Sequence, residues 1–131
     1  MEATPRDLAT FDDFFPVYVG EHSKALTRWI HFAGTHCAAA LLAAALLSRR
    51  PRLLAGVPLA GYGPAWFSHF AVERNRPATF GHPVWALRGD LTMIGMMWRG
   101  RDAELGTMAE RVKRERPVVL PGVEGQPAPA A

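Results

Sequence analysis

The chain has 131 residues, of which 49% are hydrophobic, and its formal net charge is +3. This length favours a single domain. The basic residues are scattered and are not interleaved with aromatic residues, so we expect no nucleic-acid partner. The single cysteine, Cys37, excludes an internal disulfide.

The first predicted element is a short amphipathic helix near the N-terminus. Thr10 and Asp13 have the spacing of a capping box. Three aromatic side chains follow at helical spacing: Phe11, Phe14 and Phe15. We expect this helix to lie at a membrane surface and to be disturbed at Pro16. A second helix start is expected at Ser23.

Two uncharged apolar runs follow, over residues 29–48 and 53–72, with a basic turn at 49–52 between them. Each run is about as long as an α-helix that crosses a hydrocarbon core of roughly 30 Å. We therefore predict an all-α fold, a small helical membrane protein built on a two-span hairpin with flanking interfacial helices. The alternative is a pair of buried helices in a soluble bundle, because the first run is rich in alanine and the second contains helix-breaking glycine and proline.

The segment after the hairpin contains aromatic and methionine residues, but its uncharged part, residues 91–98, is too short to span a membrane. We expect a helix there that lies at the interface or packs on the hairpin. Residues 102–116 are a candidate for a charged helix. We expect residues 1–116 to form one helical membrane domain and residues 117–131, rich in proline and alanine, to form a disordered tail.

Histidines are concentrated toward one end of the predicted hairpin. The first span leaves this end and the second returns to it, so the polar residues at both positions meet. Ionisable residues at membrane depth indicate a functional site by default, and imidazole is the commonest metal ligand among side chains. Three histidines, or two with a carboxylate, suit zinc or non-haem iron. The five histidines are His22, His31, His36, His69 and His82.

Helical spacing limits which of these residues share a site. His69 and Glu73 are four residues apart and therefore lie on one helical face. His22 and His31 are nine residues apart, on opposite faces of a continuous helix, so they share a metal only if the helix is interrupted near Ser23.

Ordinary structural roles remain as alternatives for the polar cluster. The histidines of the first run are also compatible with hydrogen bonds to the backbone or to lipid headgroups, and we favour that interpretation for His36 alone. His82, between a glycine and a proline, is typical of a loop residue. Glu73 and the arginines that follow it are compatible with a charged cap beyond a membrane span.

Two motifs make the pattern more specific. EHSKALTRWIHFAGT spans residues 21–35 and WFSHFAVERNRPATF spans residues 66–80. Together they give a histidine, a second histidine nine residues later before an apolar span, and then a span that ends in His, Glu and a basic-Pro-Ala motif. Over about residues 11–98 this order resembles the Mpo-like family of small membrane proteins. Longer eukaryotic members have a further pair of apolar segments between the motifs, so this chain resembles a short, bacterial-type branch.

The resemblance implies an iron(II)-dependent dioxygenase of 2-hydroxy fatty acids. Such an enzyme shortens the fatty acid by one carbon and releases carbon dioxide, as a step of α-oxidation. The matching motifs imply Fe(2+) ligands at His22, His31 and His69. They also imply a catalytic role for Glu73, as a fourth ligand or as a partner of the ligands. No role carries over to the remaining two histidines.

The implied substrate has a carboxylate and an acyl chain. Arg28 or Arg76 is a candidate for binding the carboxylate through a bidentate contact. The acyl chain is expected to lie along the hairpin, where Gly61, Gly63 and Pro64 open a groove.

Two other functions are compatible with the sequence. One is a non-enzymatic membrane anchor or interaction protein, in which the hairpin holds a surface-exposed tail or a partner. The other, a proton or metal carrier, needs a polar path across the bilayer, which the middle of both runs lacks. The alanine, arginine, proline and glycine usage suggests a bacterial source, so we expect an integral protein of the inner membrane. The sequence leaves the oligomeric state open.

Overall fold

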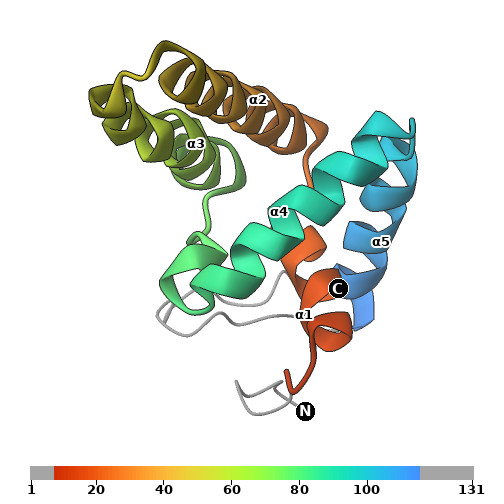
Figure 1. The fold of residues 1–131 in the computed structure, drawn as a ribbon. Coiled ribbons are helices and arrows are strands. Elements are labelled where there is room, and N and C mark those ends of the chain that lie inside the picture. The colour runs from red at the N-terminus through yellow and green to blue at the C-terminus, as the bar shows by residue number, and fades with distance from the viewer. Residues whose placement is uncertain (1–7, 116–131) are drawn as a thin grey trace.

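The computed structural model describes residues 8–115, and these residues form an all-helical fold without strands (Figure 1). The predicted all-α class is confirmed. The predicted tail, residues 117–131, lies outside the described residues. In chain order the elements are α1 (Phe11–Gly20), α2 (Ala25–Ser48), the 3₁₀ helix η2 (Pro51–Ala55), α3 (Gly56–Phe67), the π-helix η3 (Ser68–Glu73), the 3₁₀ helix η4 (Ala78–Phe80), α4 (Pro83–Trp98) and α5 (Asp102–Glu115).

Helix α1 begins as predicted, at a capping box. The hydroxyl of Thr10 accepts a hydrogen bond from the main-chain N–H of Asp13 at 3.2 Å, and the Asp13 carboxylate accepts one from the Thr10 N–H at 3.1 Å. The helix then continues through Pro16 to Gly20, so the expected disturbance at Pro16 is wrong. Packing explains this, because α1 lies against α5 and α4.

The predicted position of α1 at a membrane surface stays a prediction, but one face of the helix is covered by protein. Its apolar face forms part of the core that α1 shares with α4 and α5, and these three helices lie together in Figure 1. Methionines supply much of the α4 contribution, and flexible thioether side chains fill irregular gaps well. The buried apolar cluster consists of Phe14, Tyr18, Val19, Ala86, Met93, Met96, Met97, Leu105 and Ala109.

Helices α2 and α3 lie side by side as an antiparallel pair (Figure 1). The close approach depends on Gly34, where an added Cβ would lie only 3.2 Å from the main-chain oxygen of Ala60. The residues of the predicted second span are divided among η2, α3 and η3. Among the described helices, α2 alone is long and apolar enough to cross a membrane. The helical hairpin is therefore present, but a hairpin of two membrane spans is not confirmed.

Candidate metal centre

Three histidines from three different elements converge in the interior. His22 lies in the link between α1 and α2, His31 lies on α2, and His69 lies on η3. All three are buried, and one ring nitrogen from each lies within 4.8 Å of those of the other two. The ring centroid of His22 lies 4.5 Å from that of His31 and 4.5 Å from that of His69.

The break between α1 and α2 makes this convergence possible. Residues 21–24 separate the two helices, close to the expected restart at Ser23. His22 is therefore not on a continuous helix with His31, and the unfavourable nine-residue spacing no longer applies. The wide turn of η3 closes the cluster from the other side, since it carries His69.

Each of the three rings is oriented by a hydrogen bond at Nδ1. Since each acceptor is an oxygen, Nδ1 donates in every case, and the lone pair of the neutral ring is left on Nε2. Metal-binding histidines are usually oriented in this way. The acceptors for His22, His31 and His69 are the main-chain carbonyl of Tyr18 at 2.6 Å, the carboxylate of Asp90 at 2.9 Å and the side-chain amide oxygen of Asn75 at 2.6 Å.

The Nε2 atoms of His22 and His31 are buried and have no hydrogen-bond partner among the described residues. An unpaired buried acceptor is costly, by about 1–3 kcal/mol. A metal ion bound to these nitrogens would remove that cost. The donor set fits a divalent transition metal, because neutral imidazoles suit zinc, copper, iron and nickel.

The protonation behaviour of the cluster agrees with metal binding. Burial lowers the pKa of His69 to about 4, an effect that the hydrogen bond to Asn75 opposes. Burial, together with the neighbouring His31 and His69, lowers the pKa of His22 well below its ordinary value. Both rings are therefore neutral at pH 7, which is the form that binds a metal.

Glu73 is the last residue of η3, and its carboxylate contacts the N-terminus of α2. It is not a member of the group of three histidines. Its carboxylate accepts hydrogen bonds from the Ser23 hydroxyl at 2.8 Å, the Lys24 main-chain N–H at 2.6 Å and the Thr27 hydroxyl at 2.8 Å. A carboxylate at a helix N-terminus is stabilised by the free N–H groups and the helix dipole. This geometry favours a partner that holds the elements of the site together over the predicted fourth ligand.

Arg28 is buried and fully engaged within the protein. Its guanidinium donates to both oxygens of Asp102 on α5, at 2.6 and 3.1 Å, and to the main-chain carbonyls of His22 at 2.9 Å and Ser23 at 3.0 Å. It does not line the pocket described below. Arg28 thus fixes the link that carries His22, and the geometry does not support the predicted contact with a substrate carboxylate.

The predicted substrate-binding residue Arg76 and the two remaining histidines lie outside the cluster. Arg76 is exposed, with its guanidinium carbon 5.6 Å from the ring centroid of Phe80. His36 accepts a hydrogen bond from the indole N–H of Trp98 at 2.9 Å. His82 stacks on Trp85, with ring centroids 5.5 Å apart.

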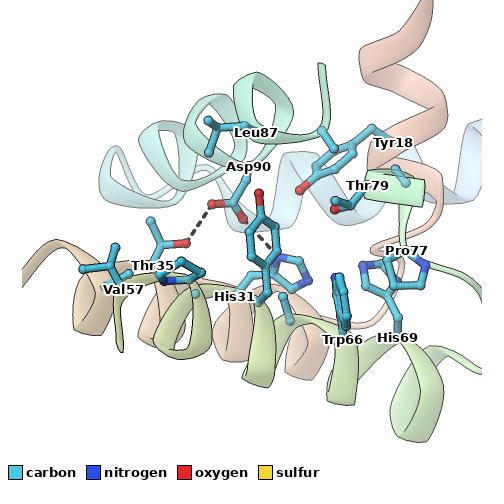
Figure 2. Close-up of a pocket in the computed structure, with 17 residues that line it drawn as sticks. Tyr18, His31, Thr35, Val57, Trp66, His69, Pro77, Thr79, Leu87 and Asp90 are labelled. Atoms are coloured by element: carbon cyan, nitrogen blue, oxygen red, sulfur yellow. Dashed lines mark hydrogen bonds and ion pairs between the residues drawn. The ribbon is translucent and has the colours of Figure 1, made fainter. Parts of the chain in front are cut away.

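A pocket of about 270 Å³ begins at the histidine cluster. Figure 2 shows His31, His69 and Asp90 around its polar end. From there the lining is mostly apolar and runs between the α2–α3 hairpin and α4, past Gly61 to Val57. The expected groove along the hairpin is therefore present at Gly61, whereas Gly63 and Pro64 do not line it.

Sequence analysis missed the three groups that orient the histidines. Asn75 lay inside the second motif, between the two arginines, and Asp90 is the only acidic residue of α4. A single carboxylate in an otherwise apolar helix is a signal that was available. The carbonyl of Tyr18 carries no sequence signal, because every residue has one.

The fold and the site define a helical protein with a candidate three-histidine metal centre at the polar end of an apolar pocket. Residues 8–102 match the family described as 2-hydroxy-palmitic acid dioxygenase Mpo1-like, and the chain belongs to this family. The predicted family is therefore confirmed. No curated protein and no solved structure matches the chain.

Proposed function

We propose that the protein is an iron(II)-dependent dioxygenase of 2-hydroxy fatty acids. The observation that carries this proposal is the convergence of three buried, oriented imidazoles at the polar end of an apolar pocket. The description of the family names 2-hydroxy-palmitic acid, which supports the substrate class. In the proposed reaction, the hydroxy acid and O₂ yield an acid one carbon shorter, carbon dioxide and water.

His22, His31 and His69 would hold the iron through Nε2. Iron(II) bound there would supply the redox chemistry with O₂ and a positive charge for the oxygen atoms of the substrate. The residues of the chain orient the ligands. Neutral imidazole ligands would leave the bound iron its positive charge, which an anionic hydroxy acid would complement.

The pocket provides a place for the acyl chain. Val57 and His69 both line it and lie twelve residues apart, which corresponds to about 18 Å along a helix axis. The walls over this distance include Ala38, Pro58 and Ala65, which offer no charge. We propose that the carboxylate and hydroxyl of the substrate lie at the histidines and that the alkyl chain runs toward the closed turn of the hairpin.

The surface around the pocket favours a membrane location. Tyr62, Trp66 and Leu87 line the pocket and are also exposed, at 39%, 36% and 54%. The pocket therefore opens between α3 and α4 onto an apolar surface. Exposed apolar surface of this kind marks membrane or protein interaction sites, and the length and apolar character of α2 favour the membrane. Further large apolar side chains exposed on α3, η4, α4 and the outer side of α2 include Leu59, Phe80, Val84, Leu91, Leu46 and Leu47.

We propose that the protein is an integral membrane protein, held by α2 and the apolar faces of α3 and α4. In a bacterial source this location is the inner membrane. A fatty acid already dissolved in the bilayer would then reach the pocket through the α3–α4 opening without crossing water.

Oxygen consumption and product analysis test the proposed activity. The protein is extracted in detergent, loaded with iron(II) without oxygen, and mixed with 2-hydroxypalmitate or palmitate. We expect O₂ uptake and a one-carbon-shorter product with the hydroxy acid only. A parent protein that binds no metal after this treatment would instead support a non-enzymatic membrane anchor.

A further inference from the structure

The phenol of Tyr18 is a polar group of the pocket to which the proposed function gives no role. Tyr18 is only 3% exposed, and it lines the pocket. Its main-chain carbonyl serves His22, whereas its hydroxyl takes part in none of the hydrogen bonds found within residues 8–115. Figure 2 shows this hydroxyl directed into the pocket, on the side where Asp90 and Thr79 lie.

The position of the Tyr18 ring is tightly defined. Its centroid lies 4.1 Å from that of His22, and the ring also packs against Gly89 of α4. A Cβ at Gly89 would lie 3.1 Å from the ring, so glycine makes room for the phenol. The hydroxyl is therefore presented beside the metal centre by a ring with little freedom to move.

Asp90 presents the complementary group to the same space. One of its oxygens accepts from His31 and the other from the Thr35 hydroxyl at 2.7 Å. A carboxylate has about four lone-pair sites, so Asp90 retains the capacity to accept another hydrogen bond. Its side chain is 15% exposed and lines the pocket. A donor, Tyr18, and an acceptor, Asp90, thus border one polar space.

We propose that Tyr18 and Asp90 together recognise the 2-hydroxyl group of the substrate. The phenol donates to the hydroxyl oxygen, and the hydroxyl donates to the Asp90 carboxylate. This inference rests on the proposed function, and it assigns the residues that separate 2-hydroxy acids from ordinary fatty acids. A hydroxyl satisfies both groups because it is donor and acceptor at once. A carboxylate in the same place would be repelled by Asp90, so the acid group of the substrate lies on the histidine side.

An unhydroxylated fatty acid would leave the Tyr18 hydroxyl without a partner and the remaining acceptor capacity of Asp90 unused. A site built to hydrogen-bond a hydroxyl discriminates strongly against the analogue that lacks it, because buried polar groups are then left unpaired. The hydroxyl group thus determines both binding and position.

The test is a thermodynamic cycle over one residue and one ligand group. Binding of 2-hydroxypalmitate and of palmitate to the parent protein and to Tyr18→Phe is followed by quenching of tryptophan fluorescence, without oxygen so that no turnover occurs. Phenylalanine retains the ring that packs on His22 and Gly89, and the metal content of each sample is measured in parallel. We expect the parent to prefer the hydroxy acid, and we expect Tyr18→Phe to reduce this preference by about fivefold to tenfold, with metal content unchanged and palmitate bound at least as tightly as by the parent.

Two results would overturn the assignment to Tyr18: a parent that binds both ligands equally, or a Tyr18→Phe variant that weakens both ligands by the same factor. The second result would mean that the phenol acts only in packing. A parent that binds neither fatty acid would contradict the proposed function itself, and this outcome is distinguishable because it appears before any substitution is made.

Discussion

Asp90 on α4 accepts a hydrogen bond from Nδ1 of His31 on α2 at 2.9 Å, although the two residues are 59 positions apart in sequence. This contact orients the ring and leaves its buried Nε2 without a hydrogen-bond partner among the described residues. It also ties α4 to the hairpin, because the same carboxylate accepts a hydrogen bond from Thr35. Groups that orient metal ligands in this way also contribute to metal affinity.

We predict that Asp90→Asn lowers metal affinity by about 10- to 100-fold. The neutral amide is a weaker acceptor than the carboxylate, so His31 is held less firmly and its Nε2 is less basic. Competition with a chelator measures the affinity. Glu110→Gln, which removes an exposed carboxylate from α5, is the matched control and should leave the affinity unchanged. Equal affinities of the parent and Asp90→Asn would show that this hydrogen bond does not support a metal ligand.

The pairing of Arg28 with Asp102 yields a stability prediction. Asp102→Asn leaves a buried guanidinium without its counter-charge, so we expect the free energy of unfolding to fall by about 2–3 kcal/mol. Denaturant titration in detergent measures it. We also expect weaker metal retention, because Arg28 holds the carbonyl of His22.

The pair Arg101–Glu104 is the control for this experiment. It is an ion pair of similar length, 2.6 Å, but it is exposed on the surface. Exposed ion pairs contribute little to stability, so Arg101→Ala should shift Tm only slightly. An equally small effect of Asp102→Asn would contradict the structural role given to Arg28.

Glu73 distinguishes a helix cap from a metal ligand. If it caps α2, Glu73→Ala should lower the free energy of unfolding by about 1–2 kcal/mol. The metal content of the folded fraction should remain that of the parent, because Glu73 makes its contacts with Ser23, Lys24 and Thr27. Metal lost from a Glu73→Ala protein of undiminished stability would restore the fourth-ligand interpretation.

The metal-free protein should lose stability in acid. Since burial lowers the pKa of His69 from 6.5 to about 4, the unfolded chain takes up a proton in this window and the folded chain does not. The free energy of unfolding therefore falls as the pH falls from 6.5 to 4, by roughly 3 kcal/mol for this histidine. Above pH 6.5 the His69 ring is neutral in both the folded and the unfolded chain, so it adds no pH dependence to the free energy of unfolding.

The variant His69→Gln isolates this effect, since glutamine does not titrate. We expect a shallower pH dependence of denaturation below pH 6.5 in the variant than in the parent. The parent alone does not isolate His69, because Glu21 titrates in an overlapping pH range. Burial raises the pKa of Glu21 to about 8, so its contribution makes the free energy of unfolding fall as the pH rises from 4.5 toward 8. Identical slopes for the parent and His69→Gln would show that His69 is not buried in its neutral form.

Local chemistry made part of this structure predictable from the sequence. The capping box at Thr10 depends on two residues three positions apart, and the break near Ser23 was required if His22 and His31 were to meet. The family motifs named the three histidines that the fold brings together. The capping box and the helix break depend on residues close together in sequence. The histidines are recognisable because imidazole is the commonest metal ligand among side chains.

Long-range pairing was not predictable in the same way. The sequence shows that Arg28 is charged, but its partner is Asp102, 74 residues later, rather than a substrate. The apolar face of α1 signalled burial without saying whether lipid or protein covers it, and the structure places it against α4 and α5. The second apolar run met the length of a span, but the structure divides it among η2, α3 and η3, and α3 itself continues through Gly61, Gly63 and Pro64.

The metal content of purified protein tests the central claim most directly. Metal per chain is measured after iron(II) loading for the parent, His69→Ala and His36→Ala, with His36→Ala as a histidine control from outside the cluster. We predict about one iron per chain for the parent and for His36→Ala, and none for His69→Ala, because the last variant lacks one of three ligands. If His69→Ala retains as much iron as the parent, the three-histidine centre is wrong.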